Sequence, residues 1–168
     1  TLGSVRRGGL FTLNDTTGGL TVTGPLTAGT ITNGISITTG GGALALNGAL
    51  STSGANNISL TGAGMTSAGG PLVDAGAGTI TVNGLGGAIG LGTSTLQTTN
   101  GTGSAVKIQS ATTVALGNVT AGTAGAYLVL GVLGDVTGAV TQSLNASVNV
   151  ANLTGSTANT VSVVASGT

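Results

Sequence analysis

Three aspartates, Asp15, Asp74 and Asp135, are the side chains in this sequence best suited to acid–base chemistry. Most glycosidases use two carboxylates that lie within about 10 Å of each other, but here successive aspartates are 59 and 61 residues apart. With the repeat of about 22 residues described below, they would lie roughly 14 Å from one another even on one face. Lys107 has no acidic cluster around it in the sequence. We therefore interpret the aspartates as residues that cap corners or face solvent.

Most other reactive side chains are missing from the chain. Of its 168 residues six are charged, and there is no His, Cys, Glu or Trp, which removes the usual general bases, nucleophiles and metal ligands. A glycine-rich calcium repeat needs an Asp in every repeat, whereas GGPLVDAGAG at 69–78 contains one and has no similar successor. We expect no catalytic residue, no metal and no cofactor, and hence a protein that is not an enzyme.

Charge and hydropathy limit the partners. The net charge is zero and the only basic cluster is Arg6-Arg7, whereas binding to nucleic acid requires many Lys and Arg residues. The longest apolar stretch, 127–133, is far shorter than the roughly 20 residues that span a bilayer. No basic segment followed by an apolar one opens the sequence. We expect neither a nucleic-acid partner nor membrane insertion, and a soluble mature segment.

The composition favours β-structure with a thin core. Hydrophobic residues make up 39% of the chain, but nearly all of them are Ala, Val, Leu and Ile, and the aromatic residues are limited to Phe11 and Tyr127. The 34 glycines disfavour helices, because each costs about 1 kcal/mol relative to Ala in a helix. No segment shows apolar residues at helical spacing. We expect an all-β fold whose core is filled by small aliphatic side chains.

Short runs of alternating apolar and polar residues predict the strands. Gly and Asn, which tolerate the backbone of tight turns, separate these runs, which occupy residues 19–24, 29–32, 35–38, 43–46, 58–61, 79–82, 105–109, 113–116 and 148–150. Asn-Gly pairs mark turns at 33–34, 47–48, 83–84 and 100–101. Such pairs close β-hairpins or form the corners of a solenoid, so the turn residues alone leave both architectures open.

A repeat of the apolar pairs favours the solenoid. The pairs recur at intervals of 23, 22, 26, 22 and 20 residues, beginning at Ile35, Ile58, Ile80, Val106, Leu128 and Val148. Periods of about 20 to 50 residues indicate stacked repeats. We predict a parallel β-solenoid of about eight coils of about 20–23 residues, in which these six side chains form one internal column. We expect a single unit over 1–168, with an irregular or capping turn within 1–30.

Three segments resemble a known family. They are ISITTGGGALALNGALSTSG at 35–54, AGTITVNGLGGAIGLGTSTLQTTNG at 77–101, and GDVTGAVTQS with VANLTGSTANTVSVV within 134–164. These segments are similar to the β-strand repeats of bacterial filamentous-haemagglutinin-like and autotransporter-like exoproteins. The resemblance implies a right-handed parallel β-helix, export through an outer-membrane pore as in autotransporters and two-partner secretion, and a role as an adhesin shaft or surface fibre. It brings no functional residue motif.

Tyr127, Val129 and Leu133 are the candidate interface residues. They belong to the segment 127–133, which is apolar on both alternating faces, so a strand with one buried side cannot hide all of it. Two interpretations remain open: a loop or a neighbouring strand covers Val129, or the segment is an exposed patch through which rods associate side by side or contact a partner. Tyr127 is the expected anchor of such an interface.

The outward residues suggest one alternative function. Rows of Thr on a flat solenoid face can order water, and Thr-x-Thr occurs at 21–23, 30–32 and 79–81. The outward positions expected beside the internal column are nevertheless mixed: Ser36, Ser59, Thr81, Lys107, Val129 and Asn149. We therefore expect a non-catalytic structural or adhesive segment of a secreted, bacterial-type surface protein or extracellular fibre. A module whose flat face binds ice or glycan is the alternative.

The ends of such a solenoid are a further source of contacts. A coil that stops without a cap presents unpaired edge strands, which template pairing with another chain. If the chain is a whole subunit, we expect it to associate end to end into a fibre. The expected location is extracellular, either secreted or at the cell surface, with a host or environmental surface as the ligand.

Overall fold

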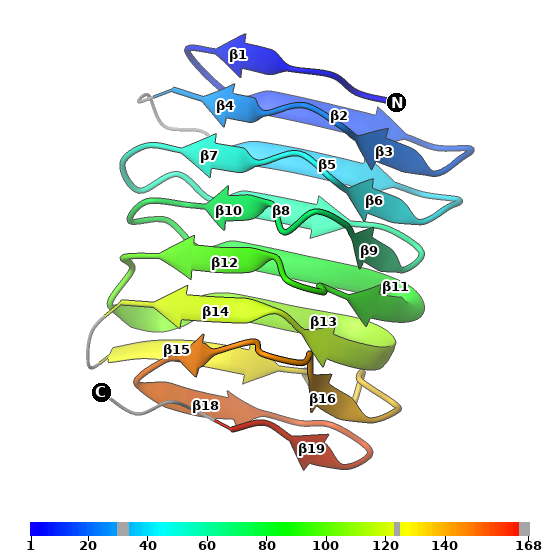
Figure 1. The fold of residues 1–168 in the computed structure, drawn as a ribbon, viewed down its shortest axis with the longest axis vertical. Helices are drawn as coiled ribbons and strands as arrows, with labels where there is room; N and C mark the ends of the chain where they lie inside the picture. Colours follow the sequence, from blue (N-terminus) through cyan, green and yellow to red (C-terminus); the bar gives the residue numbers. More distant parts are fainter. Residues whose placement is uncertain (30–33, 123–124, 165–168) are drawn as a thin grey trace.

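The computed structural model describes residues 1–29, 34–122 and 125–164. Within these residues every helix or strand is a β-strand, and all strand pairs between successive coils are parallel. The chain winds through seven stacked coils, so that the N-terminus lies at one end of the stack and the last coil at the other (Figure 1). The expected parallel β-solenoid is therefore confirmed.

Each coil contributes strands to three faces, which we number in chain order. Face 1 contains β2 (Phe11–Asp15), β5 (Ile35–Thr39), β8 (Ile58–Thr61), the start of β11 (Ile80–Gly90), the middle of β13 (Thr102–Leu116), β15 (Gly125–Leu130) and β18 (Asn152–Gly155). Face 2 contains β3 (Leu20–Val22), β6 (Leu44–Leu46), β9 (Met65–Ser67), the ends of β11 and β13, β16 (Val140–Gln142) and β19 (Val161–Ser162). Face 3 contains β1 (Val5–Arg7), β4 (Leu26–Ala28), β7 (Leu50–Thr52), β10 (Leu72–Asp74), β12 (Thr95–Thr98), β14 (Asn118–Ala121) and β17 (Val148–Asn149).

Columns of aliphatic side chains fill the interior. On face 1, in-register pairing places one inward residue of each coil above the next, in the series Ile35, Ile58, Ile80, Val106 and Leu128. All five are buried. Faces 2 and 3 contribute matching buried columns, which include Leu44, Met65, Ile89, Val114 and Val140 on face 2 and Leu26, Leu50, Val73, Leu96 and Val119 on face 3. Similar shapes stack closely at the interstrand spacing of about 4.8 Å, which explains the scarcity of aromatic residues.

One member of the expected column is wrong. Val148 lies on face 3, where it pairs with Val119, and the residue that follows Leu128 on face 1 is Leu153. Phe11 continues the column at the other end by pairing with Ile35. The sixth coil is longer than the repeat interval suggested, because it contains turns around residues 131–135 and 143–147. Val148 therefore belongs to face 3 of the sixth coil, and the face 1 strand of the seventh coil begins a few residues later.

The number of coils also differs from the expected eight. Successive face 1 strands are separated by 22 to 26 residues, which is more than the 20–23 expected, so the described residues make seven coils. The additional residues lie at corners, since β11 and β13 both contain register shifts where the chain turns from face 1 to face 2. Within 1–30, where an irregular or capping turn was expected, residues 11–28 make a coil in register with the next.

The Asn-Gly pairs at 47–48, 83–84 and 100–101 lie where the chain turns between faces, and parallel pairing on both sides excludes hairpins at these positions. The pair at 33–34 and the expected strand at 29–32 fall largely outside the described residues. Glycine is needed at these corners because coils approach closely: a Cβ atom on Gly48 would lie 2.3 Å from the carbonyl oxygen of Gly24 in the preceding coil.

Buried polar side chains hold the corners together. The Thr52 hydroxyl donates to the Asn56 carbonyl oxygen at 2.9 Å, and the Asn56 amide donates to the Gly29 carbonyl oxygen at 3.0 Å. The Thr98 hydroxyl donates in the same way to the Gly78 carbonyl oxygen at 2.5 Å. Among the described residues, no buried side-chain nitrogen or oxygen lacks a hydrogen-bond partner. The corners are therefore defined by specific hydrogen bonds as well as by glycine.

Candidate functional site

An uninterrupted row of polar side chains runs along the outside of face 3. In-register pairing aligns one outward residue from each strand, in the order Arg6, Thr27, Ser51, Asp74, Gln97, Thr120 and Asn149. We call this row the polar column. Its members are spaced by about 4.8 Å, the distance between neighbouring strands. Because every position carries a hydrogen-bonding side chain, the polar column is the longest regular array of functional groups on the described surface.

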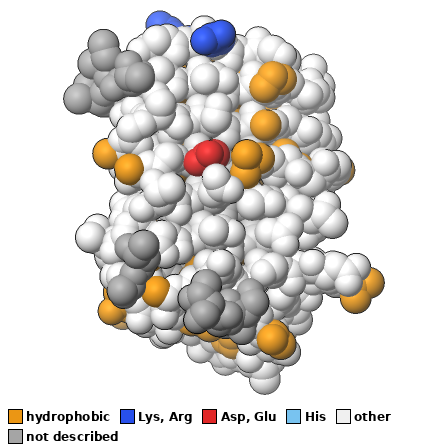
Figure 2. Space-filling view, turned by 60° about the vertical axis from the view of Figure 1, so that its left-hand side comes forward, with side chains coloured by type: hydrophobic (Ala, Val, Ile, Leu, Met, Phe, Trp, Pro, Cys, Tyr) orange, Lys and Arg blue, Asp and Glu red, His pale blue; other side chains and the backbone are white. Residues whose placement is uncertain are grey.

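Hydrogen bonds link neighbours within the polar column. The Thr27 and Ser51 hydroxyl oxygens are 3.3 Å apart, and the Gln97 amide nitrogen lies 3.3 Å from a carboxylate oxygen of Asp74. Figure 2 brings this side of the molecule forward and shows basic side chains at its upper end and an acidic side chain near its middle, on a surface that is otherwise mostly uncharged. The polar column therefore combines a positive end, a hydroxyl pair and a carboxylate.

The three aspartates lie at turns, as expected. One carboxylate oxygen of Asp15 accepts from the backbone N–H of Thr17 at 3.2 Å. Asp74 accepts from the N–H of Gly76 at 2.8 Å, and Asp135 accepts from the N–H of Val132 at 2.7 Å. Asp15 and Asp135 both lie where the chain turns from face 1 to face 2, but in the first and sixth coils, whereas Asp74 ends a strand of face 3 in the third coil. Each carboxylate thus stabilises its own turn, and the structure does not bring any two of them together.

The candidate interface residues are only partly covered. On β15 the side chain of Tyr127 is 39% exposed and Val129 is half-buried. Val129 is flanked in register by Lys107 and Thr154. Leu133 lies beyond the strand, at the corner, and is 96% exposed. Tyr127 and Val129 therefore form a small apolar strip on the outside of face 1, with Leu133 at its margin.

Leu133 also has an unusual backbone. Its φ angle is 56°, in the left-handed region of the backbone that residues other than Gly and Asn rarely adopt. Leu85 and Ser110, at the corresponding corner of the two preceding coils, have φ angles of 45° and 52°. The Ser110 hydroxyl donates to a carboxylate oxygen of Asp135 at 3.0 Å, which links the corners of the fifth and sixth coils. This corner is therefore tight and conformationally strained in three successive coils.

Face 1 carries a second, shorter polar array. The outward residues of its first four coils are Thr12, Ser36, Ser59 and Thr81, and two residues further along each strand are Asn14, Thr38, Thr61 and Asn83. In the fifth coil Lys107 and Gln109 continue the two rows with larger side chains, and in the sixth coil Val129 interrupts the first row. Asn149 lies on face 3 instead of in this row, and Thr154 takes the last position. The mixed outer face expected from the sequence is therefore confirmed, although its first four coils are uniformly polar.

Within residues 1–29, 34–122 and 125–164, no three His, Cys, Asp or Glu side chains lie close enough together to hold a metal ion. The same residues include no helix with the length and apolar character needed to cross a membrane.

Sequence reasoning missed the polar column although a signal for it was present. From Thr27 onwards its members recur at intervals of 24, 23, 23 and 23 residues as far as Thr120, which is the same repeat that revealed the internal column. Apolar pairs reveal the internal column but not this row, because the strands of face 3 contain only one or two large aliphatic residues each and lack alternating apolar pairs.

Comparison with protein-family models, with curated proteins and with solved structures found no match to the chain in any of the three. The fold itself defines the class, which is that of parallel β-solenoid repeat proteins.

Proposed function

We propose that this chain is a structural or adhesive segment of a secreted, bacterial-type surface protein or extracellular fibre, and that it has no catalytic role. The observation that carries the proposal is the set of continuous aliphatic columns inside seven in-register coils. Each coil buries its open sides only against its neighbours, so coils can be added in series to make a rod of any length. A protein built in this way is suited to holding other parts at a distance from a surface.

Secretion is supported by the folding properties of the chain. The sequence has no cysteines and six charged residues, and every strand pairs with strands of adjacent coils. Such a chain can cross a pore unfolded and then fold coil by coil as it emerges. The resemblance of 35–54, 77–101, 134–143 and 150–164 to exoprotein repeats implies the same route.

Fragments that end at coil boundaries test this folding route. We expect fragments 1–98 and 1–121, which keep the first four and five coils, to fold into β-structure by circular dichroism. Their free energy of unfolding should rise with each coil, because nearest-neighbour interfaces add up. A chain that folds only when all coils are present would contradict the proposal.

The full coding sequence tests the location independently, since we expect secretion and anchoring segments beside this one. A cytoplasmic enzyme domain beside it would contradict a surface role.

A surface-binding role is the second candidate, and the polar rows of face 1 favour it. Thr, Ser and Asn side chains form two adjacent rows over four coils, which is a patch roughly 14 Å long. Inhibition of ice recrystallisation tests binding to ice, and a glycan array tests binding to sugars. Activity that is lost when Ser59 and Thr61 are replaced by Val would favour this function over the scaffold.

We further propose that copies of the chain associate with each other, and that they do so side by side more readily than end to end. Tyr127, Val129 and Leu133 offer apolar surface on the flank of the rod. End-to-end stacking is opposed at the N-terminal end by Arg7, which occupies an inward position above Ala28. Sedimentation of the wild-type chain and of Tyr127→Ser tests the side-by-side mode: it predicts association that the substitution weakens.

A further inference from the structure

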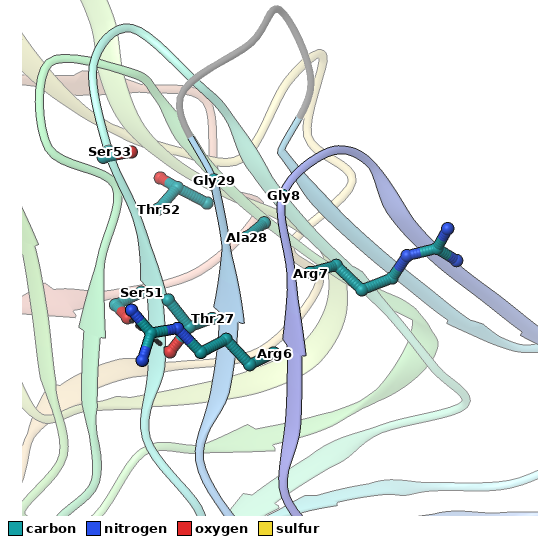
Figure 3. Close-up of a pocket in the computed structure, with 9 residues that line it drawn as sticks. All are labelled: Arg6, Arg7, Gly8, Thr27, Ala28, Gly29, Ser51, Thr52 and Ser53. Atoms are coloured by element: carbon teal, nitrogen blue, oxygen red, sulfur yellow. Dashed lines mark hydrogen bonds between the residues drawn. The ribbon is translucent and has the colours of Figure 1, made fainter.

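The N-terminal end of face 3 contains an open hollow of about 390 Å³. Its lining includes Arg6 and Arg7 on β1, Thr27 on β4 and Ser51 on β7. The Arg6 side chain extends over Thr27 towards Ser51, whereas the Arg7 side chain extends away from both (Figure 3). Small-molecule sites in proteins have volumes of about 300–1,000 Å³. The hollow is therefore large enough for a molecule of the size of a sugar.

Arg6 supplies a positive charge that the protein leaves available. It is exposed, and the nearest acidic member of the polar column, Asp74, is three strands away, or about 14 Å. The Asp74 carboxylate already accepts from the Gly76 N–H and the Gln97 amide. A guanidinium presents its N–H donors as a planar fork that matches the two oxygens of a carboxylate. Arg6 is thus placed to bind an anionic group at the edge of the hollow.

The hydroxyl groups beside Arg6 suit a polyhydroxylated ligand. The Thr27 and Ser51 oxygens are 3.3 Å apart, so they contact each other but retain further donor and acceptor capacity. Both side chains are half-buried and face outward next to the guanidinium (Figure 3). A sugar ring offers hydroxyl groups at similar spacing, which can donate to and accept from both residues.

The residues that line the hollow include a guanidinium but no aromatic side chain, which favours an anionic ligand over a neutral one. Phe11 and Tyr127, the aromatic residues of the chain, lie on face 1, in β2 and β15. A neutral sugar would have no ring to stack on, so the charge-assisted contact with Arg6 must provide most of the affinity. Arg7 points to the opposite side of β1 (Figure 3). One guanidinium therefore faces the hollow, which matches a carboxylate better than a phosphate with nearly two negative charges.

We propose that Arg6, Thr27 and Ser51 bind a sugar acid, with its carboxylate on Arg6 and its ring hydroxyls on Thr27 and Ser51. This binding goes beyond the scaffold role and does not depend on it. A site at one end of the polar column would attach the rod to acidic polysaccharide.

Titration with the methyl glycoside of glucuronic acid, followed by amide chemical shifts in ¹H–¹⁵N NMR spectra, tests the proposal. We expect shifts confined to β1, β4 and β7 and a Kd on the order of millimolar. Methyl glucoside, the neutral analogue, should bind at least about tenfold more weakly, because it lacks the charge-assisted contact. Arg6→Gln should weaken binding of the acid by a similar factor. Arg7→Gln is the matched control: it removes the same charge from the same strand and should leave the Kd within about twofold.

Three results would overturn the proposal. Equal binding of methyl glucoside would show that the carboxylate is not recognised. Equal affinity for sulfate or phosphate would show a simple anion site without sugar recognition. Equal loss in Arg6→Gln and Arg7→Gln would show attraction to the charged end as a whole. Ser51→Ala provides a second variant, which should weaken binding of the sugar acid about threefold because one hydrogen bond is lost. None of these outcomes bears on the fragment series, so failure of this site and failure of the scaffold role are distinguishable.

Discussion

At the scale of single residues, Leu133 combines a left-handed backbone with a side chain that is 96% exposed. The left-handed conformation costs most L-residues roughly 1–2 kcal/mol, and an exposed side chain recovers little of this by burial. Asn adopts this conformation more readily than Leu because its short amide can hydrogen-bond locally.

We therefore predict that Leu133→Asn raises the free energy of unfolding by about 0.5–1 kcal/mol, measured by urea denaturation. Leu144→Asn is the control, because Leu144 is 87% exposed and has no positive φ angle; its effect should stay within about 0.5 kcal/mol. If Leu133 anchors side-by-side contacts, the same variant should associate less in sedimentation. A loss of stability in Leu133→Asn would show that the leucine is buried or that its backbone is not strained.

The sequence predicted residue positions well where the apolar alternation is strong. Ile35, Ile58 and Ile80 could be assigned to one column because Ile alternates there with Ser or Thr. The position of Arg6 was not predictable in the same way. Its neighbours in the polar column, Thr27 and Ser51, belong to three-residue strands, and Thr and Ser are common at many positions of this chain. The strain at Leu133 depends on a corner geometry that no local pattern encodes.

At the scale of strands, an inward side chain is buried more deeply, and so contributes more to stability, in the middle of the stack than at its end. Ile80 is fully buried between Ile58 and Val106. Leu153, in the last coil, is 43% exposed because the described residues place no further strand beyond it. Removing side-chain atoms leaves a cavity only where neighbours surround them on both sides.

Ile80→Ala should therefore lower the free energy of unfolding by about 2–5 kcal/mol. Leu153→Ala, the matched control from the same column, should lower it by about 1 kcal/mol, because much of its side chain is already in water. Urea denaturation of the two variants measures the difference. Similar losses at both positions would indicate that Leu153 is covered in solution, by another copy or by a different fold of the last coil.

The face 1 strands of the second to sixth coils were predictable because they contain alternating apolar pairs, and so were β3, β6 and the end of β13 on face 2. The strands β2 and β18 of face 1, and β9, β16 and β19 of face 2, were missed. The strands of face 3 were largely missed. β4, β7 and β10 are three residues long, and β4 and β7 each contain one large aliphatic residue, so alternation over a longer run could not be seen. Their conformation is imposed by pairing with the strand above and the strand below, which is a contact between residues more than 20 positions apart.

At the scale of the whole molecule, the two ends of the rod differ chemically. At the N-terminal end Arg7 occupies an inward position, in register with the buried Ala28. At the other end Leu153 and Val161 expose apolar surface, and residues 152–164 contain no acidic side chain. An inward-pointing charge on an edge strand is a known protection against edge pairing, since stacking would bury an unpaired guanidinium.

We predict that Arg7→Val promotes end-to-end association of the 168-residue chain, with a mean mass by light scattering that rises steeply with concentration. Arg6→Thr removes the same charge from an outward position and should leave the mass unchanged. If both variants associate equally, net charge and not the inward position of Arg7 controls assembly. If neither associates more than the wild type, Arg7 does not protect the end.

The architecture was predictable from the repeat, but the number of coils was not. An interval between apolar pairs does not distinguish strand residues from the extra residues at corners, such as those at the register shifts of β11 between Asn83 and Ile89 and those of the turn at 131–135. Because these turns lengthen some coils, the length of the chain overstated the number of coils. The right-handed winding implied by the exoprotein resemblance stays a prediction.

The distance between labelled residues on face 1 tests most directly whether the coils stack in register. The chain has no cysteine, so spin labels attach only at the two cysteines introduced in each double variant. One variant combines Thr12→Cys with Lys107→Cys, and the other combines Thr12→Cys with Thr154→Cys. The pairs lie four and six coils apart in one outward row, which predicts backbone separations of about 19 and 29 Å. Electron–electron double resonance should give the longer distance for the second pair, by about 10 Å. Equal distances, or a shorter one for Thr12 and Thr154, would contradict a stack of parallel coils.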